Sequence, residues 1–184
     1  MTTLLADALI ETANHEASLK IREVGGMNRG AKVQEYQRAA GLKPGDPWCA
    51  AFVAWCLMQS RQLDKPPTWA SGSVATTYHK ARRKLPPEAI TTPLHVDYKE
   101  TVKPGWLWLR AKDSKGATEC RAGVWVQGHC GIVVEVNEIG FTTVEGNTNA
   151  GGSRDGDGVY KRLHKWATVA DINRTIAWFN PLNI

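Results

Sequence analysis

The sequence predicts an α+β domain in which helices come first and an antiparallel sheet follows. Apolar residues recur at helical spacing in the first half, as in the stripe formed by Leu5, Leu9 and Ala13. Beyond about residue 105 they alternate as in half-buried strands, and short segments such as 137–140 join them. Parallel neighbours would need long crossovers, so these turns indicate antiparallel pairing. We therefore expect one domain over residues 1–184, with N-terminal helices packed on a C-terminal sheet.

Composition supports a single basic domain. The chain of 184 residues is 42% hydrophobic and 22% charged, which suffices for a full core. The net charge of +5 favours anionic polymers as partners. The basic residues are scattered and lack the interleaved aromatics of a nucleic-acid module, so we expect no nucleic acid as a partner. No stretch is long and apolar enough for a membrane span, so we expect no stable membrane insertion.

Four helices are expected in the first half of the chain. Their approximate positions are 5–13, 33–40, 49–59 and 74–81. A glycine-rich loop at 21–30 separates the first two, and Gly41 ends the second. Ser71 or Ser73 can cap the fourth helix, and Pro86-Pro87 ends it.

Five strands are expected in the second half. Their approximate positions are 106–109, 130–136, 141–145, 159–163 and 175–179. The pattern between 90 and 105 is irregular. We expect 112–126 to form a surface loop or a ragged hairpin.

The third helix carries a cysteine in its first turn. Pro47 cannot continue a preceding helix, Asp46 can cap a following one, and Cys49 then lies where free backbone N–H groups and the helix dipole favour a thiolate. An isolated cysteine in an apolar helix is more often a buried core residue. A nucleophilic role for Cys49 therefore requires a base elsewhere in the chain.

The four cysteines do not have the spacing of a zinc site, and we expect no metal or cofactor. Cys49 and Cys56 are too far apart on one helix to form a disulfide, and Cys120 could reach Cys130 only if the intervening loop folds back. We expect four free thiols, as in a reducing compartment. The segment 155–158 resembles part of a calcium loop but lacks the further ligands, so we interpret it as a tight turn.

His129 has the best context among five histidines to serve as the base. It stands at the start of an apolar strand between small residues, where the scaffold is rigid and the ring has room. A histidine beside glycine is often structural, but a cysteine nucleophile needs a base within hydrogen-bond reach. We interpret the other four, His15, His79, His95 and His164, as solvated residues.

A third residue should hold the imidazole, and strand alternation offers two candidates. Glu145 and Asn147 share one face of the strand that follows the turn at 137–140. With a three-residue loop, Val133 would oppose Glu145, and His129 would lie on the same face as Glu145 and Asn147. A loop one residue longer or shorter would place them on opposite faces. The pattern leaves open whether Glu145 or Asn147 orients the ring.

Three short motifs follow one another along the chain: Trp48-Cys49-Ala50-Ala51-Phe52-Val53, Gly128-His129-Cys130-Gly131-Ile132-Val133 and Glu145-Gly146-Asn147. In this order and spacing they resemble the CHAP family of cysteine, histidine-dependent amidohydrolases and peptidases, over roughly residues 21–160. These are papain-like cell-wall hydrolases, related to the NlpC-type peptidases and common in phage endolysins. Two features depart from the family pattern. Cys130 replaces the usual small or apolar residue after the histidine, and Trp106 follows Pro104-Gly105 where an aspartate is common.

The resemblance implies a papain-like fold with Cys49 as nucleophile, His129 as base, and Glu145 and Asn147 as supports. It implies hydrolysis of a peptidoglycan amide, either between muramic acid and L-alanine or within the stem peptide. Trp48 would wall the cleft against substrate, unless it packs in the core. We expect a monomer that is made in the cytoplasm without a signal peptide and acts on the cell wall or periplasm after release.

Other functions remain open on the sequence alone. Holin-dependent release would make the protein a phage endolysin, whereas a secreted antibacterial toxin would need an immunity protein. A non-catalytic wall-binding module would not depend on Cys49. An acyltransferase of papain-like fold would pass the acyl group to an amine or alcohol in place of water.

Overall fold

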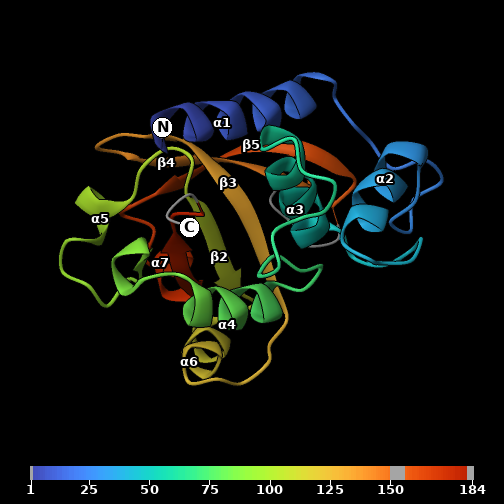
Figure 1. The fold of residues 1–184 in the computed structure, drawn as a ribbon. Helices are drawn as coiled ribbons and strands as arrows, with labels where there is room; N and C mark the ends of the chain where they lie inside the picture. The colour runs from blue at the N-terminus through green and yellow to red at the C-terminus, as the bar shows by residue number, and fades with distance from the viewer. Residues whose placement is uncertain (1, 150–155, 182–184) are drawn as a thin grey trace.

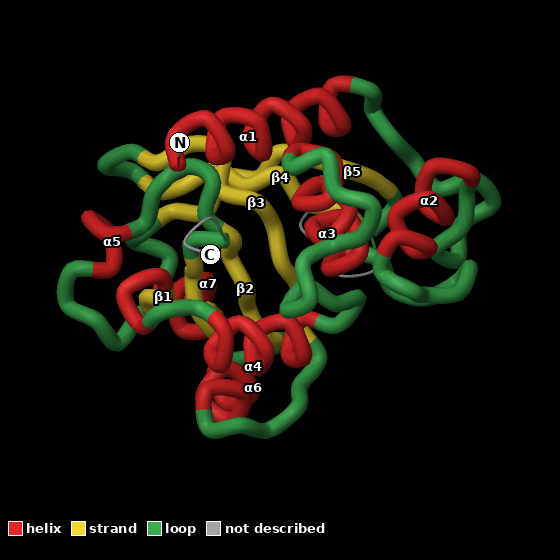
Figure 2. Tube along the Cα trace, in the orientation of Figure 1, coloured by secondary structure: helices red, strands yellow, loops and turns green. Residues whose placement is uncertain are grey.

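The computed structural model describes residues 2–149 and 156–181 and has a mixed α+β architecture. Helices surround a twisted sheet, as Figures 1 and 2 show. The helices are α1 (Thr2–Ser18), α2 (Ala31–Ala39), α3 (Cys49–Ser60), α4 (Val74–Lys84), α5 (Tyr98–Thr101), α6 (Ser114–Arg121) and α7 (Val169–Arg174), with a 3-10 turn at Pro87–Ala89. The strands are β1 (Ile90–Thr91), β2 (Leu107–Ala111), β3 (Gly128–Val136), β4 (Gly140–Thr148), β5 (Gly158–Lys165) and β6 (Thr175–Phe179). The predicted α+β class is confirmed.

All strand pairs in the sheet are antiparallel, in the order β1-β6-β2-β3-β4-β5. Strands β2 to β5 form the expected meander. The last strand, β6, returns to lie between β1 and β2. The C-terminal end of β2 and the N-terminal ends of β3 and β6 therefore lie at the same end of the sheet, beside α4 and α6 (Figure 1).

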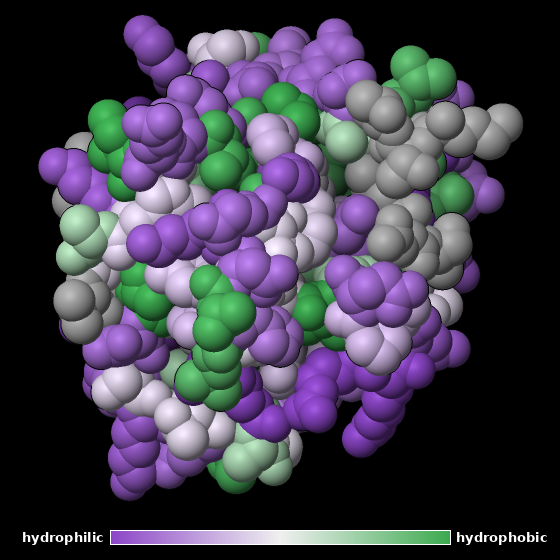
Figure 3. Space-filling view, turned by 90° about the vertical axis from the view of Figure 1, so that its left-hand side faces the viewer, coloured by the Kyte–Doolittle hydropathy of each residue, from purple (hydrophilic) through white to green (hydrophobic). Residues whose placement is uncertain are grey.

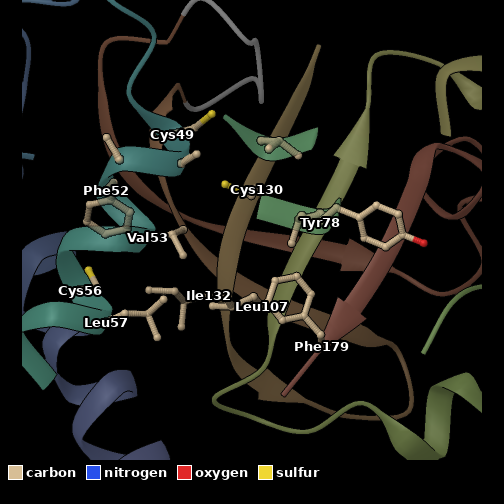
Figure 4. Packing of buried hydrophobic residues seen from close by; sticks show 14 of the residues in the cluster. Cys49, Phe52, Val53, Cys56, Leu57, Tyr78, Leu107, Cys130, Ile132 and Phe179 are labelled. Atoms are coloured by element: carbon tan, nitrogen blue, oxygen red, sulfur yellow. The ribbon is translucent and has the colours of Figure 1, made fainter. Parts of the chain in front are cut away.

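Two apolar cores cover the two faces of the sheet. On one face, α3 is buried along its whole length from Cys49 to Leu57, and its side chains meet Leu107, Ile132 and Phe179 of the sheet (Figure 4). The other face carries an aromatic cluster of Trp106, Trp108, Phe141, Trp166 and Trp178. Covering both faces keeps water away from the centre of β3 and β4.

The prediction that 112–126 forms a surface loop or a ragged hairpin is wrong, because this segment contains helix α6. Asp113 caps it, because its Oδ1 accepts a hydrogen bond from the Gly116 N–H at 2.8 Å. Ala117 and Cys120 face the core from this helix. The short elements β1, α5 and α7 were also not predicted.

The register of β3 and β4 differs from the predicted one, but the predicted face is right. Val133 lies opposite Thr143, two residues from the predicted Glu145. Near the turn, Val136 pairs with Phe141, and a register shift between Val133 and Glu135 adds one residue to β3. The pair of Val136 and Phe141 encloses a four-residue loop, one residue longer than predicted. That loop alone would place His129 and Glu145 on opposite faces of the sheet. The bulge reverses them again, so His129 and Glu145 come to share one face.

The surface seen in Figure 3, on the α5 side of the molecule, is mainly hydrophilic, and its apolar residues lie in small separate groups. No helix among the described residues has both the length and the hydrophobicity needed to cross a membrane.

Candidate active site

Cys49 is the first residue of α3, at the end of the helix that lies above Cys130 of β3 in Figure 4. The predicted cap by Asp46 is wrong, because its Oδ2 accepts from the Lys43 N–H at 2.8 Å instead. The N-cap position is held by Trp48, whose side chain accepts no capping hydrogen bond. An indole has no acceptor to offer, so the first N–H groups of α3 keep no side-chain cap.

His129, at the start of β3, is held by a buried carboxylate. Its Nε2 lies 2.8 Å from Glu145 Oε2, and both side chains are almost fully buried. The other ring nitrogen, Nδ1, is buried and makes no hydrogen bond of normal geometry to any described residue. Glu145 thus fixes the orientation of the ring and leaves Nδ1 open for chemistry.

Gly131 makes this arrangement possible. A Cβ at Gly131 would lie only 2.7 Å from Glu145 Cγ and 3.0 Å from the Thr143 side chain. The absence of a side chain at this position of β3 is what allows the carboxylate of the neighbouring strand to lie beside His129.

Glu145 also binds a second histidine, which contradicts the prediction that His164 is solvated. His164 Nε2 lies 2.7 Å from Glu145 Oε1, and the Thr143 hydroxyl donates to the same oxygen at 2.5 Å. His164 is buried against the Trp108 ring, with 4.1 Å between the ring centroids. The cluster therefore runs from His129 through Glu145 to His164. No sequence motif marks His164. It lies on the same face of β5 as Arg162 and Tyr160, and the pairing of β5 with β4 brings this face beside Glu145.

The hydrogen bonds of Asn147 to described residues go elsewhere than to His129. In the orientation that satisfies its amide, its oxygen accepts from the Trp48 N–H at 3.2 Å, and its nitrogen donates to Asn28 Oδ1 at 3.1 Å. It has a left-handed backbone, with φ of 54°, which asparagine tolerates better than most residues. Of the two predicted candidates, Glu145 holds the ring, and Asn147 fixes the backbone that leads into α3.

The two thiols and the imidazole shift one another's protonation. A hydrogen bond from the Cys130 thiol lowers the pKa of Cys49 well below its ordinary value, aided by His129 and the Ala50 N–H against the opposing effect of burial. The same hydrogen bond, followed by burial, raises the pKa of Cys130. Burial alone would lower the pKa of His129, but its contacts with Cys49 and Glu145 raise it to about 9. Both shifts favour a thiolate and imidazolium pair over the neutral thiol and imidazole.

The Glu145 carboxylate stays ionised despite its burial. Burial alone would raise the pKa of Glu145, but hydrogen bonds and charge interactions with His129 and His164 hold that pKa far below its usual range. A permanent negative charge therefore lies behind the imidazolium, on the side away from Nδ1.

A cleft of about 370 Å³ opens beside Cys49. Pro47 and Asn147 line it on the α3 side, and the segment 125–128 lines it on the other. The predicted substrate contact, Trp48, is absent from this cleft. Its ring is fully buried, stacks on Tyr36 with 5.6 Å between centroids, and donates to Glu23 Oε1 at 3.0 Å.

Trp125 supplies the aromatic wall that was assigned to Trp48. It lies on the cleft with 60% of its surface exposed, and its Nε1 donates to Ser73 Oγ at 3.1 Å. No pattern marked Trp125, because it stands in a segment expected to form a surface loop or a ragged hairpin.

The remaining cysteines have no part in this cluster. All four thiols are free and buried. Burial raises the pKa of Cys56 well above its ordinary value and that of Cys120 to about 11, so both stay protonated at neutral pH. Within residues 2–149 and 156–181, no group of histidine, cysteine and acidic side chains is arranged to hold a metal ion. Of the predicted tight turn at 155–158, Asp155 lies outside the described residues.

We compared the chain with models of protein families, with curated proteins and with solved structures, and none of the three comparisons gave a match.

Proposed function

We propose that this protein is a cysteine amidohydrolase of the CHAP type that cleaves an amide bond of bacterial peptidoglycan. The observation that carries the proposal is the pairing of Cys49, at an uncapped helix start, with an imidazole whose Nε2 is held by Glu145. The order of the three motifs supports the family and the papain-like fold. The net charge of +5 suits an anionic wall polymer.

The reaction is acyl transfer to water. The Cys49 thiolate attacks the carbonyl carbon of the amide, and the backbone N–H of Cys49 binds the oxyanion. His129 gives its Nδ1 proton to the leaving nitrogen as the C–N bond breaks, which leaves a thioester on Cys49. Nδ1 then takes a proton from water, which attacks the thioester and releases the acid and the thiolate.

The supports act through these two groups. Glu145 keeps Nδ1 directed at the reacting atoms and stabilises the imidazolium. Asn147 holds the Trp48 backbone and so the start of α3. His164 and Thr143 bind the same carboxylate oxygen and keep it in place. These are positioning residues.

The test is digestion of purified peptidoglycan by wild type, Cys49→Ala and Cys56→Ala protein, with mass spectrometry of the released fragments. Cys56 is the matched control, because it is a buried thiol of the same helix with a raised pKa. We expect wild type and Cys56→Ala to release the same fragments and Cys49→Ala to release none.

The fragments also identify the bond. Free stem peptides with new muramic-acid ends indicate an amidase, and cut stems still attached to sugar indicate an endopeptidase. A wall left intact by wild type, or digested equally by Cys49→Ala, would refute the proposal.

A further inference from the structure

A second cavity, of about 340 Å³, is lined by His129 and adjoins the Cys49 cleft. Its lining includes His129 but not Cys49, whereas the first cleft is lined by Cys49 but not by His129. Gln127 and Gly128 line both, so the two spaces meet over this segment at the start of β3.

The sheet topology brings three cations to this second cavity. Arg110 is the penultimate residue of β2, and Lys112 directly follows the strand. β3 starts beside this end of β2, and Arg174 immediately precedes β6. Because β2 is antiparallel to both neighbours, its end lies between their starts, and Arg110 is directly opposite His129. None of the described residues that line the cavity is acidic. Neither Lys112 nor Arg174 forms an ion pair with a described residue.

The Cys49 cleft and the second cavity would hold different parts of a substrate. In the proposed function, on which this step rests, His129 gives its proton to the leaving nitrogen. The leaving nitrogen therefore lies at His129, and the amine fragment would continue into the cationic cavity that His129 lines, while the acyl fragment lies beside Cys49 and the Trp125 wall.

We infer that the cavity bounded by Arg110, Lys112 and Arg174 is a subsite for a carboxylate on the amine side of the cleaved bond. Guanidinium groups bind carboxylates through paired charge-assisted hydrogen bonds, and a lysine adds a point charge. Stem peptides of the wall carry free carboxylates, so the leaving group would be an acidic peptide with its amine at His129.

The experiment measures binding without hydrolysis. Cys49→Ala protein is titrated by calorimetry with the tripeptide L-alanyl-γ-D-glutamyl-L-lysine, and separately with the same tripeptide in which both carboxylates are carboxamides. We expect the acidic peptide to bind at least about 10-fold more tightly, with a preference that weakens as salt is added.

Variants assign the preference to the cavity. When Lys112→Met and Arg174→Met are both introduced into the Cys49→Ala protein, the difference in affinity between the acidic and the amidated peptide should disappear. Lys115→Met is the matched control, because Lys115 is exposed on α6 and pairs with Glu119 outside the cavity. Equal binding of the two peptides, no binding of either, or a preference that survives loss of both cations would overturn the inference. Wall digestion is measured separately, so a failure of the proposed function is distinguishable from a failure of this subsite.

Discussion

Glu145 binds three side chains in a site from which water is excluded, and its charge controls the protonation of His129. In the proposed reaction, the active form has a Cys49 thiolate and a His129 imidazolium. We therefore expect kcat/KM to rise as pH increases through the lowered pKa of Cys49, and to fall as pH increases through about 9, where His129 loses its proton.

Glu145→Gln tests this origin of the basic limb. The amide keeps the shape but removes the charge that raises the pKa of His129, so the basic limb should move to lower pH and activity at pH 7 should fall by about 10²-fold. Glu135→Gln is the control, since Glu135 is an exposed acid on the same strand as His129. Unchanged basic limbs in Glu145→Gln would show that the carboxylate does not set the pKa of His129.

The placement of the site residues was predictable where local motifs determine it and not where burial by distant elements does. Cys49, His129 and Glu145 come together as expected, because helix start, strand start and strand alternation are local features. Trp48 and His164 were misjudged. Whether an aromatic or a histidine faces solvent depends on which element packs against it. Glu23 of the loop at 21–30 binds Trp48, and Trp108 of β2 and Glu145 of β4 enclose His164, so neither environment is local in the sequence.

At the scale of elements, the β3 and β4 pair depends on a glycine and a bulge. Gly131→Ala places a methyl group 2.7 Å from Glu145 Cγ and 3.0 Å from the Val144 carbonyl oxygen, so one strand must shift. We expect a loss of about 1–3 kcal/mol in the free energy of unfolding. We also expect more than a 10-fold loss of kcat/KM, because the carboxylate moves away from His129.

Urea denaturation and wall digestion measure these two losses. Gly116→Ala is the control, because it lies in helix α6 and its new Cβ would meet no atom closer than 3.3 Å. If Gly131→Ala retained full activity, the close approach of the two strands would not be needed for the orientation of His129.

Strand alternation predicted the shared face of His129 and Glu145, but the register was two residues out. The bulge between Val133 and Glu135 leaves no mark in a run of apolar residues, because any of them can occupy it. Helix α6 was missed for a different reason. Its eight residues offer only Ala117 and Cys120 to the core, too few for a helical period to stand out.

For the molecule as a whole, the return of β6 to lie between β1 and β2 could not be inferred from local patterns, because it pairs residues at least 65 positions apart, as in Arg110 and Thr175. That return carries Arg174 to the edge where β2 ends and β3 starts. The second cavity thus depends on long-range topology, whereas Cys49 and His129 are each placed by a local element.

The stability of the whole molecule should depend on pH through the same buried groups. His129 has a raised pKa in the folded protein, so its stabilising contribution is present below pH 6.5 and is lost as pH rises to about 9. Cys49 has a lowered pKa, so its contribution is present above the ordinary value of 9.0 and is lost as pH falls below it. The two contributions therefore change in opposite directions with pH.

Glu145 makes the acid limb of the stability curve steep. Its pKa is depressed in the folded state, so its stabilising contribution is present above the ordinary value of 4.5 and is lost as pH falls below it, where the unfolded chain takes up a proton first. The slope from this group is at most about 1.4 kcal/mol per pH unit. Glu145→Gln removes it, so we expect the variant to be less stable than wild type at pH 7 and the two free energies of unfolding to converge between pH 4.5 and 3. Urea denaturation across this range measures both, and Glu135→Gln should run parallel to wild type. A gap between wild type and Glu145→Gln that stayed constant down to pH 3 would mean that the buried carboxylate is not ionised in the folded protein.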